Sequence, residues 1–289
     1  MTQASPPLLS LITIDVAVVV YRSDLDWLAR TLTSLAASIS KAIAQGVVGV
    51  AHISIIDNDA AATAEDGRQL AKLVDAAVGK DTEKITHTIL RQASNRGYGA
   101  GNNAALRNSS ADYVLIQNPD VQMTVDSITN AITYLASQPT CGMITPVATS
   151  LDGQVQYLVK AYPDITTLLA RGFAPKWLKT LVNKRLSNYD RTDIAYNAAI
   201  LDAVIVSGCC MLFRGEVWRR VGGFDEKFFL YFEDFDLSKR VAETSQIHRL
   251  PTFQIIHGGG NASNKGLKHI SLFVQSAWRF FHKHGWRLR

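Results

Sequence analysis

Residues 222–240 read Gly-Gly-Phe-Asp-Glu-Lys-Phe-Phe-Leu-Tyr-Phe-Glu-Asp-Phe-Asp-Leu-Ser-Lys-Arg. An aromatic-rich run, 228–232, is followed directly by three carboxylates, those of Glu233, Asp234 and Asp236. Acidic side chains beside bulky apolar ones are costly to bury, so they are either solvated or held for a purpose such as proton abstraction or cation binding. A simpler interpretation is an acidic helix N-terminus, because carboxylates complement the helix dipole.

Upstream, the first half of the chain alternates strand-like and helix-like patterns, which predicts a mostly parallel sheet covered by helices on both faces. In such sheets ligands bind beyond the carboxyl ends of the strands. Polar clusters begin there at Tyr21, Asp57 and Asn118. Strands are predicted at 16–21, 50–57, 85–90, 113–117 and 143–147, and helices at 24–45, 66–78, 99–108 and 126–137.

Size and cysteine content set broad limits. A chain of 289 residues that is 47% hydrophobic can form one large α/β domain or two small ones. Three cysteines, Cys141, Cys209 and Cys210, give no disulfide framework and suit a reducing cytoplasm. Because the sequence has no apolar run of about 18 residues and no basic region before an apolar N-terminal run, we expect neither a membrane-spanning helix nor a secretory signal.

The net charge of +5 is unevenly distributed. Lys and Arg without any acid occupy 171–185 and 265–289, which indicates an anionic surface or ligand. No nucleic-acid-binding motif accompanies them, so nucleic acid is not expected as a partner. The amphipathic stretch 267–284 predicts a helix that either docks on the sheet or lies peripherally on a membrane surface.

Three segments together resemble the inverting nucleotide-sugar glycosyltransferases of family 2, particularly the rhamnosyltransferase-like branch. They are the 222–240 run, Asn118-Pro-Asp120 and His257. The resemblance extends from about 16 to 257 and is weakest at 160–201, where loops and short helices are expected. It implies the α/β GT-A fold, with a nucleotide-sugar-binding half at 1–150, an acceptor-binding and catalytic half at 151–262, and a basic amphipathic helix at 263–289.

By this resemblance, the strand ends and a glycine-rich segment bind the nucleotide sugar. Asp57 would accept the N3–H of a uracil or thymine ring, although an Asx turn explains the same residue. The segment 95–103 would lie beside the nucleotide, or is only a flexible strand-to-helix turn. The implied donor-binding residues are Tyr21, Asp57, Asn58, Asn95, Gly97, Gly99, Asn103, Asn118 and Asp120.

Asn118-Pro-Asp120 stands where this superfamily usually carries Asp-x-Asp. The resemblance implies that Asp120 and His257 bind Mg²⁺ or Mn²⁺, which neutralises the leaving diphosphate. An amide replaces the first carboxylate, which weakens the expected metal affinity. Taken alone, Pro119 favours a type I turn, and a single His after a strand is more often structural.

The acidic pair in the 222–240 run resembles the Glu-Asp pair of the family. Asp234 would be the base that removes the proton of the acceptor hydroxyl in a single displacement. Glu233 would orient the acceptor or raise the proton affinity of its neighbour. The resemblance further places Gly208, Asp225 and Tyr231 at the acceptor or sugar pocket.

The function implied is transfer of a sugar to a hydroxyl of a cell-surface or lipid-linked glycan. L-Rhamnose from dTDP-rhamnose is the expected donor, with a UDP-hexose or UDP-galactofuranose as the alternative. A non-catalytic nucleotide- or glycan-binding relative is a further alternative. The enzyme would act in the cytoplasm, on the inner face of the membrane if the C-terminal helix contacts lipid.

Overall fold

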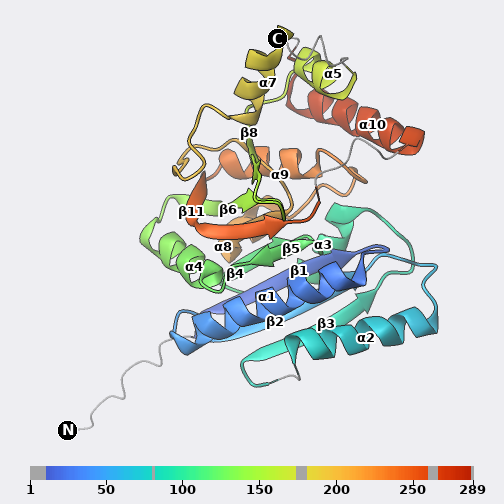
Figure 1. Ribbon diagram of the computed structural model, residues 1–289, viewed down its shortest axis with the longest axis vertical. Helices are drawn as coiled ribbons and strands as arrows, with labels where there is room; N and C mark the ends of the chain where they lie inside the picture. The colour runs from blue at the N-terminus through green and yellow to red at the C-terminus, as the bar shows by residue number, and fades with distance from the viewer. Residues whose placement is uncertain (1–10, 80–81, 174–180, 260–265, 288–289) are drawn as a thin grey trace.

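The computed structural model describes residues 11–79, 82–173, 181–259 and 266–287. Its centre is a nine-stranded sheet in the order β3-β2-β1-β4-β10-β6-β11-β5, with β7 paired to β6 (Figure 1). The strands are β1 (Thr13–Val20), β2 (Val50–Asp57), β3 (Ile85–Arg91), β4 (Tyr113–Gln117), β5 (Val121–Met123), β6 (Cys141–Thr149), β7 (Val155–Gln156), β10 (Cys210–Arg214) and β11 (Gln246–His257).

The first half of the chain confirms the predicted alternation of strands and helices. Strands β3, β2, β1 and β4 are parallel neighbours. Asp24 caps the first helix: its Oδ1 accepts the N–H groups of Asp26 and Trp27 at 2.9 and 3.0 Å, which satisfies donors that have no partner inside the helix. The helices that follow these strands are α1 (Leu25–Ala44), α2 (Ala64–Val78), α3 (Tyr98–Leu106) and α4 (Ser127–Ser137).

The second half makes the sheet mixed rather than mostly parallel. Strand β10 is antiparallel to both β4 and β6, whereas β11 is parallel to β6 and antiparallel to β5. Before β10 the chain breaks at Ser207–Cys209, because the preceding strand β9 (Ile205–Val206) lies outside the main sheet and pairs with β8 (Val159–Lys160). This break lies at the centre of the site described below.

Both faces of the sheet are covered, as the apolar strands indicated. On β1, Val16 and Val18 join a core cluster with α1, α2 and α4, whereas Ala17 and Val19 join a second cluster on the other face with α3, α8 and α9. The remaining helices are α5 (Ile165–Phe173), α7 (Asn183–Asp190), α8 (Gly215–Val221), α9 (Glu233–Ala242) and α10 (Gly266–His284).

A third cluster, built mostly of aromatic residues, holds the C-terminal helix against the rest of the protein. It contains Leu168 of α5, Tyr189 of α7, Phe232 beside α9, and Phe280 and Phe281 of α10. Figure 1 shows α5, α7 and α10 together at the end of the molecule opposite α2. The amphipathic C-terminal stretch therefore docks through its aromatic face, and no helix among the described residues is long and apolar enough to span a bilayer.

Candidate active site

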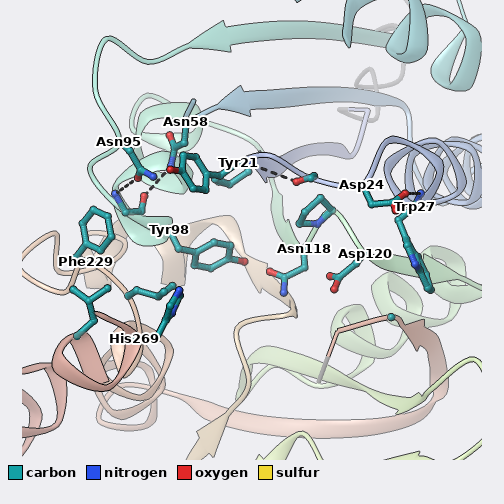
Figure 2. A pocket seen from close by; sticks show the side chains of 17 residues that line it. Tyr21, Asp24, Trp27, Asn58, Asn95, Tyr98, Asn118, Asp120, Phe229 and His269 are labelled. Carbon is teal, nitrogen blue, oxygen red and sulfur yellow. Dashed lines mark hydrogen bonds between the residues drawn. The ribbon is translucent and has the colours of Figure 1, made fainter. Parts of the chain in front are cut away.

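A pocket of about 800 Å³ opens beyond the carboxyl ends of β1, β2 and β4 (Figure 2). It lies where the sequence placed its polar clusters, since Tyr21, Asn58 and Asn118 each follow one of these strands and line it. The other lining residues are Val19, Ser23, Asp24, Trp27, Asn95, Gly97, Tyr98, Pro119, Asp120, Phe229, Leu230, Gly258, His269 and Leu272.

The glycine-rich segment forms one wall of the pocket. Asn95 Oδ1 accepts the Gly97 N–H at 2.9 Å, and Asn58 Nδ2 donates to the Gly97 carbonyl at 3.1 Å. Gly97 has φ of 96°, and a Cβ there would lie 2.1 Å from the carbonyl oxygen of Phe229. Only glycine permits this approach, so the segment is required at least for contact between the two walls.

Two predicted donor-binding residues of the same segment face away from the pocket. Asn103 is buried, with Oδ1 accepting the Phe224 N–H and Nδ2 donating to the Phe224 carbonyl, both at 2.9 Å. A Cβ on Gly99 would lie 2.8 Å from the Phe224 Cβ. Neither is among the pocket-lining residues, so in this structure they fix the start of the 222–240 run.

Asp57 is engaged by protein groups at the end of β2. Its Oδ2 accepts from Arg91 Nε and Nη2 at 3.0 and 2.9 Å, and its Oδ1 accepts the Asp59 N–H at 3.0 Å. The second contact is the Asx turn weighed from the sequence. Asn58, not Asp57, lines the pocket, and the nucleobase-binding role of Asp57 stays a prediction.

The short connection between β9 and β10 joins three motifs that are distant in sequence. The Asn118 N–H donates to the Cys209 carbonyl at 2.8 Å. The Gly208 N–H donates to Asp234 Oδ2 at 2.8 Å, and the Tyr98 hydroxyl donates to the Gly208 carbonyl at 2.8 Å. The Asn-Pro-Asp turn, the glycine-rich segment and the acidic pair thus meet on Gly208 and Cys209.

The two adjacent carboxyl groups have different pKa values. Burial raises the pKa of Glu233 to about 8, with a further contribution from the charge of Asp234. Burial also raises the pKa of Asp234, but only to about 6, because the N–H groups of Gly208 and Phe235 stabilise its carboxylate. Near neutral pH Asp234 is ionised and Glu233 is protonated. In this arrangement the carboxylate can accept a proton as a general base, and the neutral carboxyl group beside it can donate a hydrogen bond.

The backbone just before the acidic pair is strained. Tyr231 and Phe232 have φ of 70° and 62°, a region that bulky residues rarely adopt. Each such residue costs about 1–3 kcal/mol and persists only where surrounding contacts impose it. The turn begins helix α9 and directs Asp234 towards Gly208.

Asp120 and His257 form a second polar corner. Gln156 Nε2 donates to the carbonyls of His257 and Gly259 at 3.0 and 3.3 Å, so its Oε1 faces His257 Nδ1, 2.7 Å away, and Nδ1 carries the proton. Burial lowers the pKa of His257 and keeps it neutral. Its bare Nε2 lies 3.6 Å from Asp120 Oδ1, a buried oxygen with no hydrogen-bond partner among the described residues.

Two facing lone pairs of this kind fit a divalent cation. In the part of the chain that the structure describes, no three His, Cys, Asp or Glu side chains are grouped to hold a metal. Asp120 and His257 would therefore be two ligands among others supplied by a diphosphate and water, as is usual for Mg²⁺. Gln156, which sequence reasoning missed, fixes the tautomer of His257.

The structure ties two predicted acceptor-pocket residues to the C-terminal helix. Asp225 Oδ2 pairs with Lys283 Nζ at 2.8 Å, and the Tyr231 hydroxyl lies 2.9 Å from His269 Nδ1. His269 and Leu272 of α10 line the pocket although no motif marked them. A general amphipathic pattern was the only sequence signal for this wall.

All three cysteines are free and buried. Burial raises the pKa of Cys209 to about 12 and that of Cys141 to about 11, so both stay thiols at neutral pH. They are packing residues, because a buried thiol of high pKa is a poor nucleophile.

Structural comparison defines the fold. The chain superposes on GalNAc-T7 with UDP, GalNAc and Mn²⁺ (TM-score 0.62, 13% identity, 88% of this chain and 44% of that one). It also superposes on the Pyrobaculum calidifontis mannosyltransferase PcManGT with GDP-Man and Mn²⁺ (TM-score 0.57, 15% identity, 92% of this chain and 64% of that one). The chain thus spans less than half of the first structure. The fold is GT-A, as the sequence resemblance implied.

Sequence comparison gives the family. The Glycosyl transferase family 2 model matches residues 15–221, and the chain belongs to that family. It is 27% identical over 227 residues to N-acetylglucosaminyl-diphospho-decaprenol L-rhamnosyltransferase of Mycobacterium tuberculosis, covering 69% of each chain. It is 28% identical over 175 residues to Rhamnosyltransferase WbbL of Escherichia coli, covering 56% of this chain and 60% of WbbL.

We predict that Glu233→Gln stabilises the protein at alkaline pH. Native Glu233 holds its proton up to a pKa of about 8, whereas the unfolded residue loses it near 4.5, so wild-type stability falls as the pH rises through this window. Thermal melts at pH 9 should show a higher Tm for the variant, by roughly 2–4 °C for each kcal/mol gained in the free energy of unfolding. The gain should shrink towards pH 4. Exposed Glu83→Gln is the control, and a pH-independent difference would contradict the burial of an ionising Glu233.

Proposed function

We propose that this glycosyltransferase transfers L-rhamnose from dTDP-rhamnose to a hydroxyl of a cell-surface or lipid-linked glycan, with inversion at the anomeric carbon. The observation that carries the chemistry is Asp234, a carboxylate with a pKa of about 6 that accepts the N–H of Gly208. The Gly208 carbonyl in turn accepts the hydroxyl of Tyr98, which lines the pocket. The choice of sugar is supported by two rhamnosyltransferase relatives, one of which is named for a diphospho-decaprenol acceptor.

In this proposal each motif has a step. The nucleotide sugar would occupy the pocket between the strand ends and the glycine-rich wall. Asp234 takes the proton of the acceptor hydroxyl while the hydroxyl oxygen bonds to the anomeric carbon. At the same time the bond from that carbon to the oxygen of the nucleoside diphosphate breaks. Protonated Glu233 can donate a hydrogen bond to the acceptor. A single displacement of this kind inverts the anomeric configuration.

A divalent cation, Mg²⁺ or Mn²⁺, would be held by Asp120 and His257. Support comes from Asp120 Oδ1, which has no hydrogen-bond partner within the described part of the chain, and from the bare Nε2 of His257. When bound, the cation neutralises charge on the leaving diphosphate. Asn118 stands where the superfamily usually has a carboxylate, and it lines the same part of the pocket. Its amide oxygen could serve as a further, neutral ligand.

A different donor is the main alternative. A structural neighbour, Staphylococcus aureus TarS, was solved with UDP (TM-score 0.54, 12% identity, 94% of this chain and 68% of that one). A UDP-hexose or UDP-galactofuranose would use the same base and cation. A non-catalytic nucleotide-binding role would leave the ionised Asp234 without a purpose, which favours the enzymatic proposal.

Replacing Asp234 by Asn should abolish turnover and spare binding. Asn cannot accept the hydroxyl proton, so we expect kcat to fall about 10²–10⁴-fold, with dTDP affinity within about twofold. Wild-type kcat should rise with pH through about 6 as Asp234 ionises, and this limb should be missing from residual activity of the variant. Unchanged turnover in the variant would exclude Asp234 as the base.

Calorimetric titration of dTDP and UDP, each with Mn²⁺ and with EDTA, tests the need for a cation and the choice of nucleobase together. Metal-dependent binding that prefers dTDP is the expected result. Asp120→Ala should remove the metal dependence, whereas Asp126→Ala, which changes a half-exposed acid outside the pocket, should not. Tighter binding of UDP would point to the alternative donors, and equal affinity in EDTA would remove the cation from the proposal.

We also propose that the outer face of α10 contacts an anionic membrane. Ile270, Val274 and Trp278 recur every fourth residue on the helix and are about half exposed. Because the helix carries basic residues and no acid, it suits headgroups of negative charge. Val274→Glu should abolish flotation with phosphatidylglycerol vesicles, whereas Val125→Glu, an equally exposed position elsewhere, should not. Absence of wild-type flotation would refute the contact.

A further inference from the structure

The strained turn before the acidic pair has no local reason to form. Tyr231 and Phe232 both adopt the left-handed region without being glycine or asparagine. The Phe232 carbonyl then accepts the Asp236 N–H at 2.9 Å, the first contact of α9. Tertiary contacts must therefore hold the turn, and they can be identified.

Polar contacts to the turn come from α10. Ser276, which is 3% exposed, donates its hydroxyl to the Leu230 carbonyl at 2.8 Å. His269 Nδ1 lies 2.9 Å from the hydroxyl of Tyr231. One helix thus bonds both the backbone and a side chain of the segment directly before Glu233.

Aromatic contacts to the turn come from the same helix. The Phe232 ring packs against Phe273 and Phe280, with centroid distances of 5.1 and 5.4 Å. Tyr231 meets Phe273 edge-on at 5.7 Å. Both residues of the turn that have positive φ therefore pack their rings against α10.

A buried ion network anchors the end of α10 just beyond the acidic pair. Asp236 is fully buried, and its Oδ1 lies 2.7 Å from Lys283 Nζ and 2.8 Å from His284 Nε2. Its Oδ2 accepts from Arg240 Nε at 2.8 Å. The helix thus contacts the chain on both sides of Glu233 and Asp234.

The opposite end of α10 reaches the pocket. His269 and Leu272 line it together with Phe229 and Leu230, and Figure 2 shows His269 and Phe229 on the same side of the pocket. The family 2 match ends at residue 221, so neither the turn nor α10 belongs to the matched region. Contacts to α10 are consequently a feature of this chain that the family match does not assign.

We propose that α10 is a positioning element of the active site, with Ser276 as the residue that holds the strained 230–232 turn and thereby aims Asp234 into the site. This role rests on the proposed function, because it takes Asp234 to be the base. Ser276 touches no substrate and acts through the backbone of the turn.

The test is Ser276→Ala beside a matched variant, Ser127→Ala. Ser127 is also buried in a helix and also donates its hydroxyl to a backbone carbonyl, that of Gln254, at 2.8 Å, but it lies in α4, outside the site. Both variants should lose similar stability. Only Ser276→Ala should lower kcat, by about tenfold, with the donor KM and dTDP affinity within about twofold, and Ser276→Thr should recover at least part of the loss.

Amide hydrogen exchange of the 228–236 segment provides a readout that needs no substrate. Exchange there should be faster in Ser276→Ala and unchanged in Ser127→Ala. Equal kcat in the two serine variants, or unchanged exchange, would overturn the positioning role. An inactive wild type, or an active Asp234→Asn, would instead refute the proposed function, and the exchange result would still decide whether Ser276 holds the turn.

Discussion

The hydrogen bond from the Gly208 N–H to Asp234 Oδ2 is the contact on which the site depends. It stabilises the carboxylate where burial alone would keep it protonated, and it fixes α9 to the break between β9 and β10. A Cβ on Gly208 would lie 3.0 Å from the Asp234 Cβ. The same short connection binds Asn118 and Tyr98, so the Asn-Pro-Asp turn, the glycine-rich segment and the acidic pair are all joined to one stretch of backbone.

The carboxylate oxygens of this region differ in whether protein groups already bond to them. Asp57 and Asp236 have their oxygens bonded to arginine, lysine or backbone groups. Asp120 Oδ1 and Glu233 Oε2 are buried without a partner among the described residues. Unsatisfied buried oxygens are expensive, and native proteins retain them where a ligand completes the set. Among the carboxylate oxygens of the described residues, these two lie in the motifs to which cation binding and proton transfer are assigned.

Close approach explains the glycines better than nucleotide contact does. Gly97 brings the 95–103 wall against the Phe229 carbonyl, and Gly99 against Phe224. Both contacts join the nucleotide-side motif to the aromatic run before the acidic pair. Substrate binding and catalysis are thereby built on one packed unit, in which a shift of the turn carried by α10 is transmitted to the pocket.

The sequence by itself determined the β-α order, the cap of α1, the location of the site and the acidic pair, because these follow from local periodicity, hydrogen-bonding chemistry and motif spacing. Only the tertiary structure decided that Asn103 and Asp57 bind protein groups, that β10 runs antiparallel, and that His269 and Gln156 reach the site. Those outcomes depend on pairings between residues from 34 to 121 positions apart. No local pattern encodes such pairings, since which oxygen remains free is settled only when the chain has packed.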